Sequence, residues 1–414
     1  MTLIAHGARR GWHAFLALFF CGAVALDGTM ALGAAADEKP RARDLGVPFP
    51  GTPGPLNAIT DVAGVEVGHT TVIRGKGRLK VGKGPVRTGV TAVHPRGKAS
   101  TSPVFGGWFT LNASGEMTGT TWLEERGLVD GPILITNTHS VGVARDAAVR
   151  WMVEKGWAAD WHAPVAAETY DGTLNDINGF HVTTQHALQA MQSASGGPVL
   201  EGAVGGGTGM ICNRFKGGIG TASRRVALEG TDYTVGVLVQ CNYGRRDDLK
   251  HIAGVAVPEL QDAPSPCYRD ARLRPAGARF PVCGESMADD NGPDGSIIVV
   301  VATDAPMLPH QLNRMAKRPS LGIGRLGAVS GDGSGDIFIA FSTAFDGQLS
   351  ESQISTDLAM VPNDRLTPFF RATVEATEEA IVNAMVAADT MEGSNSVTVF
   401  ELPEQILAEI MAGQ

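Results

Sequence analysis

Clusters of basic residues are missing from this sequence. Its 414 residues include 34 Lys and Arg against 43 Asp and Glu, which gives a formal net charge of −9 without long runs of one sign. Nucleic acids and anionic membranes are bound through grouped Lys and Arg side chains. The composition therefore argues against nucleic acid or a membrane surface as a partner.

Long hydrophobic runs are also scarce. One apolar run covers residues 12–26, follows two arginines and is too short to span a bilayer comfortably. Three alanines at 34–36 provide the small residues of a cleavage site. We therefore expect residues 1–36 to be a removed export signal, and the mature protein to be periplasmic or secreted.

Cysteine is rare, and four residues would remain after signal removal: Cys212, Cys241, Cys267 and Cys283. No Cys-x-x-Cys pair is present, which argues against a structural zinc site. Cys267 and Cys283 flank a polar loop and would pair in an oxidising compartment. Four buried thiols are the alternative, and the sequence leaves both open.

The common hydrolase motifs are absent as well. The sequence has no Gly-x-Ser-x-Gly elbow and no His-Glu-x-x-His zinc motif. The glycine-rich stretch at 77–83 lacks the Ser or Thr that a phosphate loop needs. We expect no metal and no cofactor, and no histidine is an obvious base for a serine nucleophile.

The most informative stretch that is present is the junction of Gly295 and Ser296. Five β-branched residues follow it (Ile297, Ile298, Val299, Val300 and Val301), the pattern of a short strand buried on both faces. Glycine permits backbone conformations that a Cβ forbids, so the carbonyl before the serine could be attacked by its hydroxyl. By itself, the pair is more often a turn entering a strand.

Cleavage at this junction would solve the problem of the missing base. The freed α-amino group of Ser296 has a reference pKa of about 7.7–8.0, so it can accept the proton of its own hydroxyl. An oxyanion donor is also needed, and Asn242 follows the apolar strand expected at 233–241. Taken individually, Asn242 is more often a turn residue.

Two further pairs are candidates for the same site. Ser334 and Asp336 lie two apart in a glycine-lined turn before a strand, where they could hold the hydroxyl and the amine. Glu168 and Tyr170 follow a short apolar run at 165–167, and the carboxylate could bind a substrate ammonium. Turn residues and a surface acid are the alternative readings of these pairs.

The hydrophobic patterns predict one large α/β domain made of layered sheets and helices. A hairpin around Gly64 is expected over residues 59–73, and the glycine-rich residues 202–220 are expected to form loops. Further strands are expected at 90–93, 104–111, 132–136, 233–241, 336–342 and 397–400, besides the one after Ser296. Helices are expected at 141–155, 183–195, 308–317, 368–391 and from 403 onward.

Several long stretches in the same order resemble the DmpA family of self-processing aminopeptidases (L-aminopeptidase/D-amidase/D-esterase), which includes the β-peptidyl aminopeptidases. They include LNAITDVAGVEVGHTT from Leu56, ETYDGTLNDINGFHV from Glu168, FKGGIGTASR from Phe215, LVQCNYGRR from Leu238, DGSIIVVVATDAP from Asp294 and GDGSGDIFIAFST from Gly331. The resemblance covers nearly all of residues 45–412.

The resemblance implies an α-β-β-α sandwich like that of N-terminal nucleophile hydrolases, with different connectivity. It implies a single catalytic domain at 37–414, self-cleaved into an α chain (37–295) and a β chain (296–414) that associate as a homotetramer of heterodimers. It also implies a role for each candidate. Ser296 is the nucleophile, Asn242 the oxyanion donor, Ser334 the partner of Ser296, Asp336 the group orienting its amine, Tyr170 part of the catalytic pocket and Glu168 the residue facing the substrate's amino group.

The implied activity is release of N-terminal residues from short peptides, amides or esters through an acyl-enzyme on Ser296. In β-peptide-cleaving relatives Asp336 is matched by Glu, and in some of them Tyr170 by Trp, so the resemblance leans toward the DmpA-like members. Acyl transfer of the ornithine acetyltransferase type is an alternative, although those enzymes use a threonine nucleophile. A non-catalytic exported binding protein is a third possibility.

Overall fold

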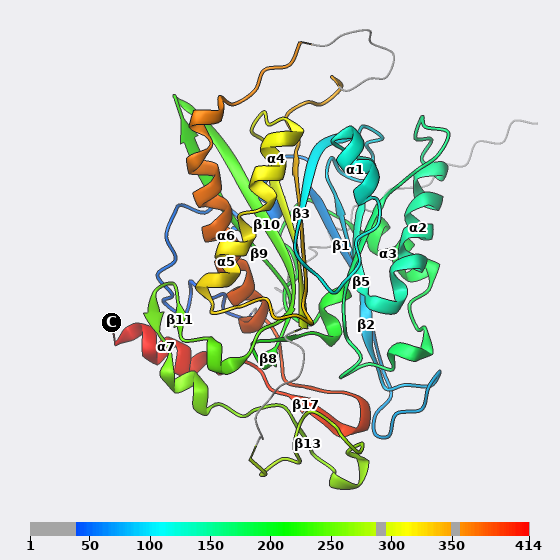
Figure 1. The fold of residues 1–414 in the computed structure, drawn as a ribbon, viewed down its shortest axis with the longest axis vertical. Helices are drawn as coiled ribbons and strands as arrows, with labels where there is room; N and C mark the ends of the chain where they lie inside the picture. Colours follow the sequence, from blue (N-terminus) through cyan, green and yellow to red (C-terminus); the bar gives the residue numbers. More distant parts are fainter. Residues whose placement is uncertain (1–38, 287–294, 349–356, 414) are drawn as a thin grey trace, which may run out of the picture. The chain divides into compact units, whose positions relative to one another are not determined.

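Two β-sheets packed face to face form the centre of the fold, and helices cover the outer face of each. The computed structural model describes residues 39–286, 295–348 and 357–413, so the predicted export signal lies outside the described part. In Figure 1 the four layers follow one another from left to right as helices, sheet, sheet and helices. This α-β-β-α arrangement confirms the predicted fold class.

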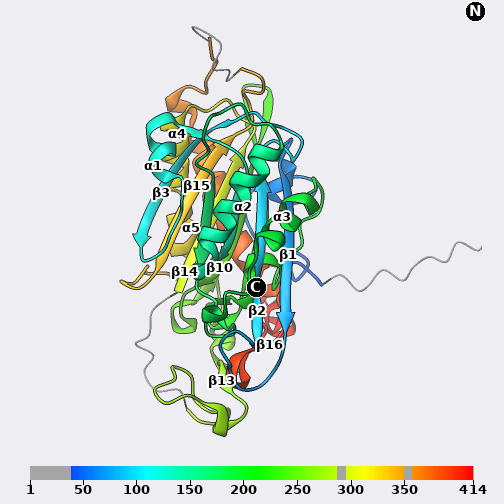
Figure 2. The same cartoon turned by 90° about the vertical axis from the view of Figure 1, so that its right-hand side faces the viewer.

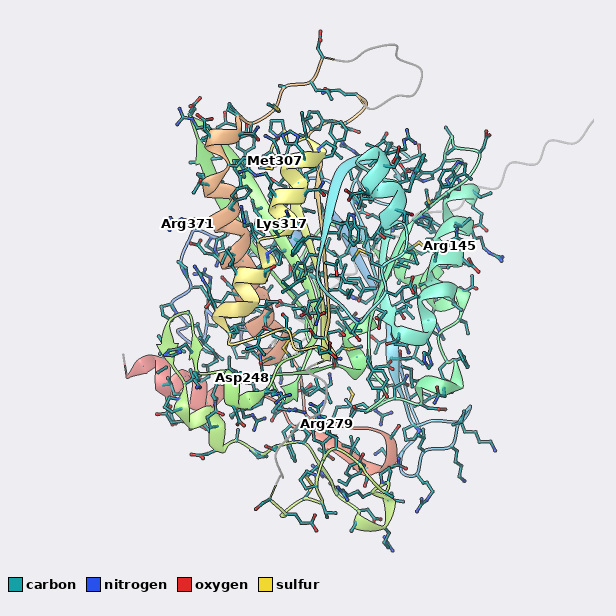
Figure 3. All side chains as sticks on the ribbon, viewed as in Figure 1. Arg145, Asp248, Arg279, Met307, Lys317 and Arg371 are labelled. Atoms are coloured by element: carbon teal, nitrogen blue, oxygen red, sulfur yellow. A yellow bond between two sulfur atoms is a disulfide. The ribbon has the colours of Figure 1, made fainter. Side chains whose placement is uncertain are left out.

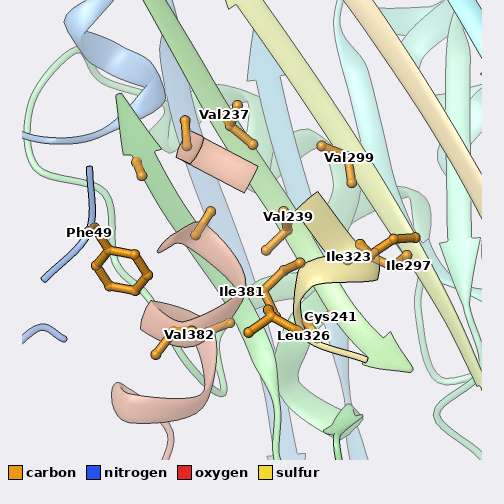
Figure 4. Close-up of a cluster of buried hydrophobic side chains, with 14 of the residues drawn as sticks. Phe49, Val237, Val239, Cys241, Ile297, Val299, Ile323, Leu326, Ile381 and Val382 are labelled. Atoms are coloured by element: carbon orange, nitrogen blue, oxygen red, sulfur yellow. The ribbon is translucent and has the colours of Figure 1, made fainter. Parts of the chain in front are cut away.

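The larger sheet has the strand order β4-β3-β15-β14-β10-β9. Its strands are β4 (Leu128–Val129), β3 (Val104–Ala113), β15 (Gly335–Ser342), β14 (Gly295–Thr303), β10 (Thr231–Tyr243) and β9 (Gly218–Leu228). Its outer face packs against α4 (Pro309–Ala316), α5 (Pro319–Arg325) and α6 (Thr367–Val386). Figure 4 shows side chains of β10 and β14 meeting those of α5 and α6 in this layer.

The smaller sheet has the order β1-β2-β5-β6, with β1 (Glu66–Arg74), β2 (Val86–His94), β5 (Ile133–Asn137) and β6 (Val165–Thr169). Helices α2 (Val141–Glu154) and α3 (Thr184–Ser193) cover its outer face. In the turned view of Figure 2 these two helices lie in front of the sheet. Of the described residues, no helix has the length and apolar character needed to cross a membrane.

The central strand β14 shows why the run after Ser296 is β-branched throughout. Ile297, Val299 and Val301 pack toward the helices, whereas Ile298, Val300 and Ala302 pack between the two sheets. All six are fully buried, as expected for a strand covered on both faces. The prediction of a core strand here is confirmed.

The smaller elements lie at one end of the sheets, below them in Figure 1. They are the hairpin of β7 (Ile211–Cys212) and β8 (Phe215–Lys216), the pair β11 (His251–Ile252) and β12 (Val255–Ala256), and the sheet of β13 (Cys267–Tyr268), β16 (Met391–Glu392) and β17 (Val397–Val399). The two remaining helices are α1 (Thr120–Arg126) and α7 (Glu404–Ala412).

Two predictions from the sequence are wrong. Residues 59–73 do not form a hairpin, because 59–61 are a 3₁₀ turn and β1 pairs with β2 instead. Residues 202–220 are not only loops, since they include β7, β8 and the start of β9. Glycine at 220 serves close packing there, because a Cβ would lie 1.9 Å from the carbonyl oxygen of Ala380 in α6.

Helix α6 also differs from its prediction. It ends at Val386 instead of 391, and it is buried on nearly all sides from Ala372 onward instead of on one face. The N-terminal segment explains this, because Arg43 pairs with Glu379 at 2.7 Å and the Ala42 N–H donates to Asn383. The helix is therefore covered on the side that the hydrophobic pattern left for solvent.

Candidate active site

Ser296 lies where three strands of the larger sheet end together. It pairs with Asn242 of β10 on one side and with Gly335 of β15 on the other. Its side chain lies on the same face of β14 as Ile298, so it points toward the smaller sheet. The side chain is 5% exposed, and its Oγ accepts a hydrogen bond of 3.1 Å from the Gly335 N–H.

Gly295 is required by the backbone at this junction. Its φ is +84°, and a Cβ at this position would lie 1.9 Å from the carbonyl oxygen of Asn242. Both the left-handed conformation and the close approach exclude larger residues. The peptide bond between Gly295 and Ser296 is thus held against the neighbouring strand in a conformation that only glycine adopts easily.

The amide of Asn242 has a fixed orientation. Its Oδ1 accepts the Ile211 N–H at 2.8 Å, and its Nδ2 donates to the Tyr170 carbonyl oxygen at 2.9 Å. A backbone donor on one side and a backbone acceptor on the other determine which end is oxygen and which is nitrogen. Because Nδ2 carries two hydrogens, Asn242 is equipped to donate to a second acceptor beside Ser296.

Ser334 and Asp336 lie behind the cavity wall and are 1% and 2% exposed. The Ser334 hydroxyl donates to Asp336 Oδ2 at 2.8 Å and accepts from Asn112 Nδ2 at 3.1 Å. The described bond to Ser296 Oγ comes instead from the backbone of the residue between them, Gly335. The predicted pair is therefore next to the nucleophile, held in a buried network.

Glu168 approaches the same place from the smaller sheet. It is the fourth residue of β6 itself, not a residue after the strand, and it is 3% exposed. Its carboxylate accepts hydrogen bonds from the Thr138 hydroxyl and, at 3.0 Å, from the Glu116 N–H. Burial raises the pKa of Glu168, while these two hydrogen bonds act in the opposite direction.

Glycine at 115 brings Glu168 close to the nucleophile. A Cβ on Gly115 would lie 3.1 Å from Glu168 Oε1 and 3.3 Å from the Gly335 Cα. The Gly335 N–H donates to Ser296 Oγ. Gly115 is therefore the only residue between the Glu168 carboxylate and the residue that binds the Ser296 hydroxyl. The two sheets therefore bring an acid and a serine to one site.

A cavity of about 720 Å³ connects these groups. Ser296, Asn242, Tyr170 and Glu168 all line it, so four of the six predicted catalytic and substrate-binding residues open into one space. The other lining residues are Ser114, Gly115, Glu116, Thr138, Thr173, Ile211, Arg214, Gly244, Arg279, Phe280, Gly295 and Gly333. The volume suits a small ligand.

The sequence reasoning missed the part of the cavity below the sheets. Arg214 comes from the β7–β8 turn, and Arg279 and Phe280 come from the segment before Cys283; Figure 3 labels Arg279 there. The guanidinium of Arg214 lies 5.5 Å from the centre of the Phe280 ring. No motif marked these residues, because their loops are brought to the site by tertiary packing.

Asp171 supports the Glu168–Tyr170 segment from within and was also missed. It is fully buried and accepts hydrogen bonds from Asn137 and Asn175, both at 3.0 Å. Burial raises its pKa to about 6. Its position directly after Tyr170 in the motif was the available signal.

Two disulfides connect segments that contribute residues to the site. Cys267 pairs with Cys283, so the disulfide alternative is the one the structure contains. Cys212 pairs with Cys241, which the sequence did not predict, and this bond lies directly beside the contact between Ile211 and Asn242. Within the described residues, no group of three or more His, Cys, Asp or Glu side chains is arranged to hold a metal ion.

Comparisons with known proteins show relatives over most of the chain. The model of peptidase family S58 matches residues 57–399. A β-peptidyl aminopeptidase BapA of Sphingosinicella microcystinivorans is 57% identical over 388 residues, covering 93% of this chain and 95% of its own length. The BapA of Sphingosinicella xenopeptidilytica is 46% identical, with 97% of each chain covered.

Solved structures show the same relationship. The L-aminopeptidase D-Ala-esterase/amidase of Ochrobactrum anthropi is described as a prototype serine aminopeptidase and a new variant of the Ntn hydrolase fold. It has a TM-score of 0.79 and 45% identity, and covers 91% of this chain and 99% of its own. A Burkholderia β-aminopeptidase has a TM-score of 0.78 and 45% identity, with 90% and 99% covered.

Proposed function

Because the chain belongs to peptidase family S58 and is an aminopeptidase with a variant Ntn hydrolase fold, we propose that Ser296 first cuts its own chain and then acts as the nucleophile. The supporting observation is the junction itself. Gly295 is held at positive φ against Asn242, and Ser296 Oγ lies in a cavity beside an amide donor and a buried acid.

Self-cleavage would proceed by attack of Ser296 Oγ on the Gly295 carbonyl carbon. The C–N bond breaks as the C–O bond forms and the hydroxyl proton passes to the departing nitrogen, which leaves an ester between the two residues and a free α-amine. Water then hydrolyses the ester, so that residue 295 ends in a carboxylate and Ser296 keeps both its hydroxyl and a free amine. Mature protein would consist of chains 37–295 and 296–414.

In the mature site the α-amine takes the proton of Ser296 Oγ as the oxygen attacks the substrate carbonyl. The second Nδ2 hydrogen of Asn242 would donate to the oxyanion, since the first is held by Tyr170. Ser334 and Asp336 would hold the hydroxyl and the amine in place, and Tyr170 would line the pocket. The protonated amine then passes its proton to the leaving amine, and water releases the acyl group.

Glu168 would select substrates with a free amino group. Its buried carboxylate reaches the cavity that Ser296 also lines, and an ammonium would complete its hydrogen bonds there. Both BapA relatives are named β-peptidyl aminopeptidases, which supports N-terminal β-amino acids as substrates. Asp336 and Tyr170, in contrast, are the residue types of the DmpA-like members, which favours N-terminal α-amino acids. The β-alanyl and alanyl p-nitroanilides are therefore the pair of substrates to compare.

Export, location and assembly belong to the same proposal. Two disulfides in the described residues support an oxidising compartment, in line with an export signal at 1–36 and a periplasmic or secreted protein. The two chains would stay together because they share one sheet. Strands β14 and β15 belong to the chain that begins at Ser296, and β14 pairs with β10 of the other chain. A homotetramer of such heterodimers is proposed from the family resemblance.

The deciding experiment is Ser296→Ala, followed by mass spectrometry and an activity assay. We expect one uncut chain and a loss of about 10⁶-fold in activity, as when other serine nucleophiles are removed. The wild type should give chains of about 27 and 12 kDa, from 43.2 kDa over 414 residues. Ser193→Ala, at an exposed position away from the cavity, is the control. Active protein with an unbroken bond before Ser296 would refute the proposal.

A further inference from the structure

Lys216 is a charged side chain in an unusual place. It is fully buried at the end of the β7–β8 hairpin. Both of its side-chain hydrogen bonds go to backbone carbonyl oxygens, to Met210 at 2.9 Å and to Gly217 at 2.6 Å. Among the described residues no carboxylate pairs with it. Burial alone lowers the pKa of Lys216 to about 7.

A buried ammonium without a counter-charge is costly. Desolvation of such an ion costs several kcal/mol, and an apolar side chain of similar length would avoid that cost. Groups in such unfavourable surroundings cluster at functional sites. The contacts of Lys216 therefore need a reason beyond filling space.

The peptide that Lys216 binds also contacts Asn242. The carbonyl of the Met210–Ile211 peptide accepts from Lys216 Nζ and, at 3.0 Å, from the Gly217 N–H. The N–H of the same peptide donates to Asn242 Oδ1 at 2.8 Å. One peptide unit thus joins the Lys216 amine to the Asn242 amide beside Ser296.

This chain of bonds has a direction. The hydrogen bond from Lys216 Nζ, which the amine donates in its charged and its neutral form alike, polarises the peptide and strengthens its N–H as a donor, and each bond in such a chain reinforces the next. The stronger bond at Asn242 Oδ1 draws electron density away from Nδ2, whose hydrogens become better donors. It also holds the amide in the orientation that an oxyanion needs.

We propose that Lys216 is a positioning residue for the oxyanion donor, acting through the Met210–Ile211 peptide to orient and polarise the amide of Asn242. This inference rests on the proposed role of Asn242 and adds a residue that acts on Asn242 without touching the substrate. The Cys212–Cys241 disulfide ties the hairpin to β10 independently of Lys216. Removing the Lys216 amine should therefore change the amide of Asn242 without releasing the hairpin.

The first test is Lys216→Met, with kcat and KM measured per mole of cut chain on an aminoacyl p-nitroanilide. We expect kcat to fall about 10-fold and KM to stay within about twofold, by analogy with metal sites, where residues that orient a ligand through one hydrogen bond contribute about 10- to 100-fold. Full retention of kcat, or a loss in KM alone, overturns the inference. If this variant does not fold, Lys216→Gln is measured instead, with the same expectation.

Arg87→Met is the matched control. Arg87 is also a buried cation whose guanidinium donates to backbone carbonyls, those of Glu392, Arg74, Val86 and Gly75, but none of these peptides contacts Asn242. Its replacement should lower the melting temperature and leave kcat per cut chain unchanged. An equal loss of kcat in both variants would show that the effect of Lys216 is only structural, and would overturn the inference.

A double-mutant cycle with Asn242→Ala separates the two proposals. Without the amide, Lys216→Met should lower kcat by less than about twofold further, because the groups act through one bond. The same 10-fold loss in both backgrounds overturns the inference. If Asn242→Ala itself keeps full activity, the role of Asn242 in the proposed function fails instead. Where Asn242→Ala stays uncut, the rate of self-cleavage replaces kcat in the cycle.

Discussion

The two walls of the cavity are built in different ways. The wall from the larger sheet holds Ser296 and Asn242, which are placed by the register of β14 between β10 and β15. The wall from the smaller sheet holds Glu168, which is paired with Thr136 of β5 and whose carboxylate is oriented by hydrogen bonds from Thr138 and Glu116. Both walls place their backbone by strand pairing, but the Ser296 oxygen is held by the neighbouring strand β15, whereas the Glu168 carboxylate is held by residues outside its own sheet.

This difference matches the two tasks of an aminopeptidase. Bond cleavage needs reacting atoms and oxyanion donors held to within about half an ångström, which neighbouring strands in fixed register can achieve. Recognition of an ammonium needs charge and partial burial, and tolerates small shifts of the acid. Variants in the first wall should therefore act mainly on kcat, and variants in the second mainly on KM.

The largest effect that tests this contrast is expected for Asn242→Ala. Loss of one oxyanion donor typically lowers kcat by 10²- to 10³-fold, and KM should change little because the amide acts on the transition state. Steady-state kinetics on cut protein gives both constants. Asn383→Ala is the control, since it removes a buried amide of α6 that bonds Thr221 and Ala42 far from the cavity. A change confined to KM would contradict the division between the walls.

A smaller effect, on KM instead of kcat, is expected for Glu168→Gln. Hydrogen bonds to charged groups contribute about 1.5–3 kcal/mol, so KM for an aminoacyl amide should rise roughly 10- to 100-fold. Glutamine keeps the shape and the acceptor oxygen for the Glu116 N–H. The N-acetylated form of the same substrate, which lacks the ammonium, should be cleaved equally by both proteins. A similar loss for both substrates would mean that Glu168 acts in catalysis or folding.

The sequence could predict the first wall better than the second. The β-branched run after Ser296 and the apolar strand before Asn242 are local patterns, and strand pairing then brought the two residues opposite each other. Arg214, Phe280 and Thr138 could not be found in this way, because their loops carry no periodicity and reach the site only through packing. Lys216 was within a recognised stretch, but its burial without a counter-charge appears only in three dimensions.

The two sheets should also differ in how far their stability depends on acidic pH. His94 of β2, in the smaller sheet, is the group that tests this difference. It is 3% exposed, packs against Trp151 and bonds the Met191 carbonyl. Burial lowers the pKa of His94 to about 4, against the effects of Met191 and Glu66 and together with Lys98 and Lys155. The unfolded chain, with a reference value of 6.5, therefore binds this proton first as the pH falls.

The free energy of unfolding should accordingly be intact above pH 6.5 and decrease between pH 6.5 and 4, by at most about 3 kcal/mol from this one group. His94→Gln removes this group and should reduce that decrease by its share, leaving the part due to His69 of β1, whose pKa burial also lowers to about 4, as measured by urea unfolding at several pH values. His310→Gln, at an exposed position of α4 on the side of the larger sheet, should leave the pH dependence as in the wild type. Equal pH dependence in all three proteins would show that burial of His94 does not make the smaller sheet the acid-sensitive layer.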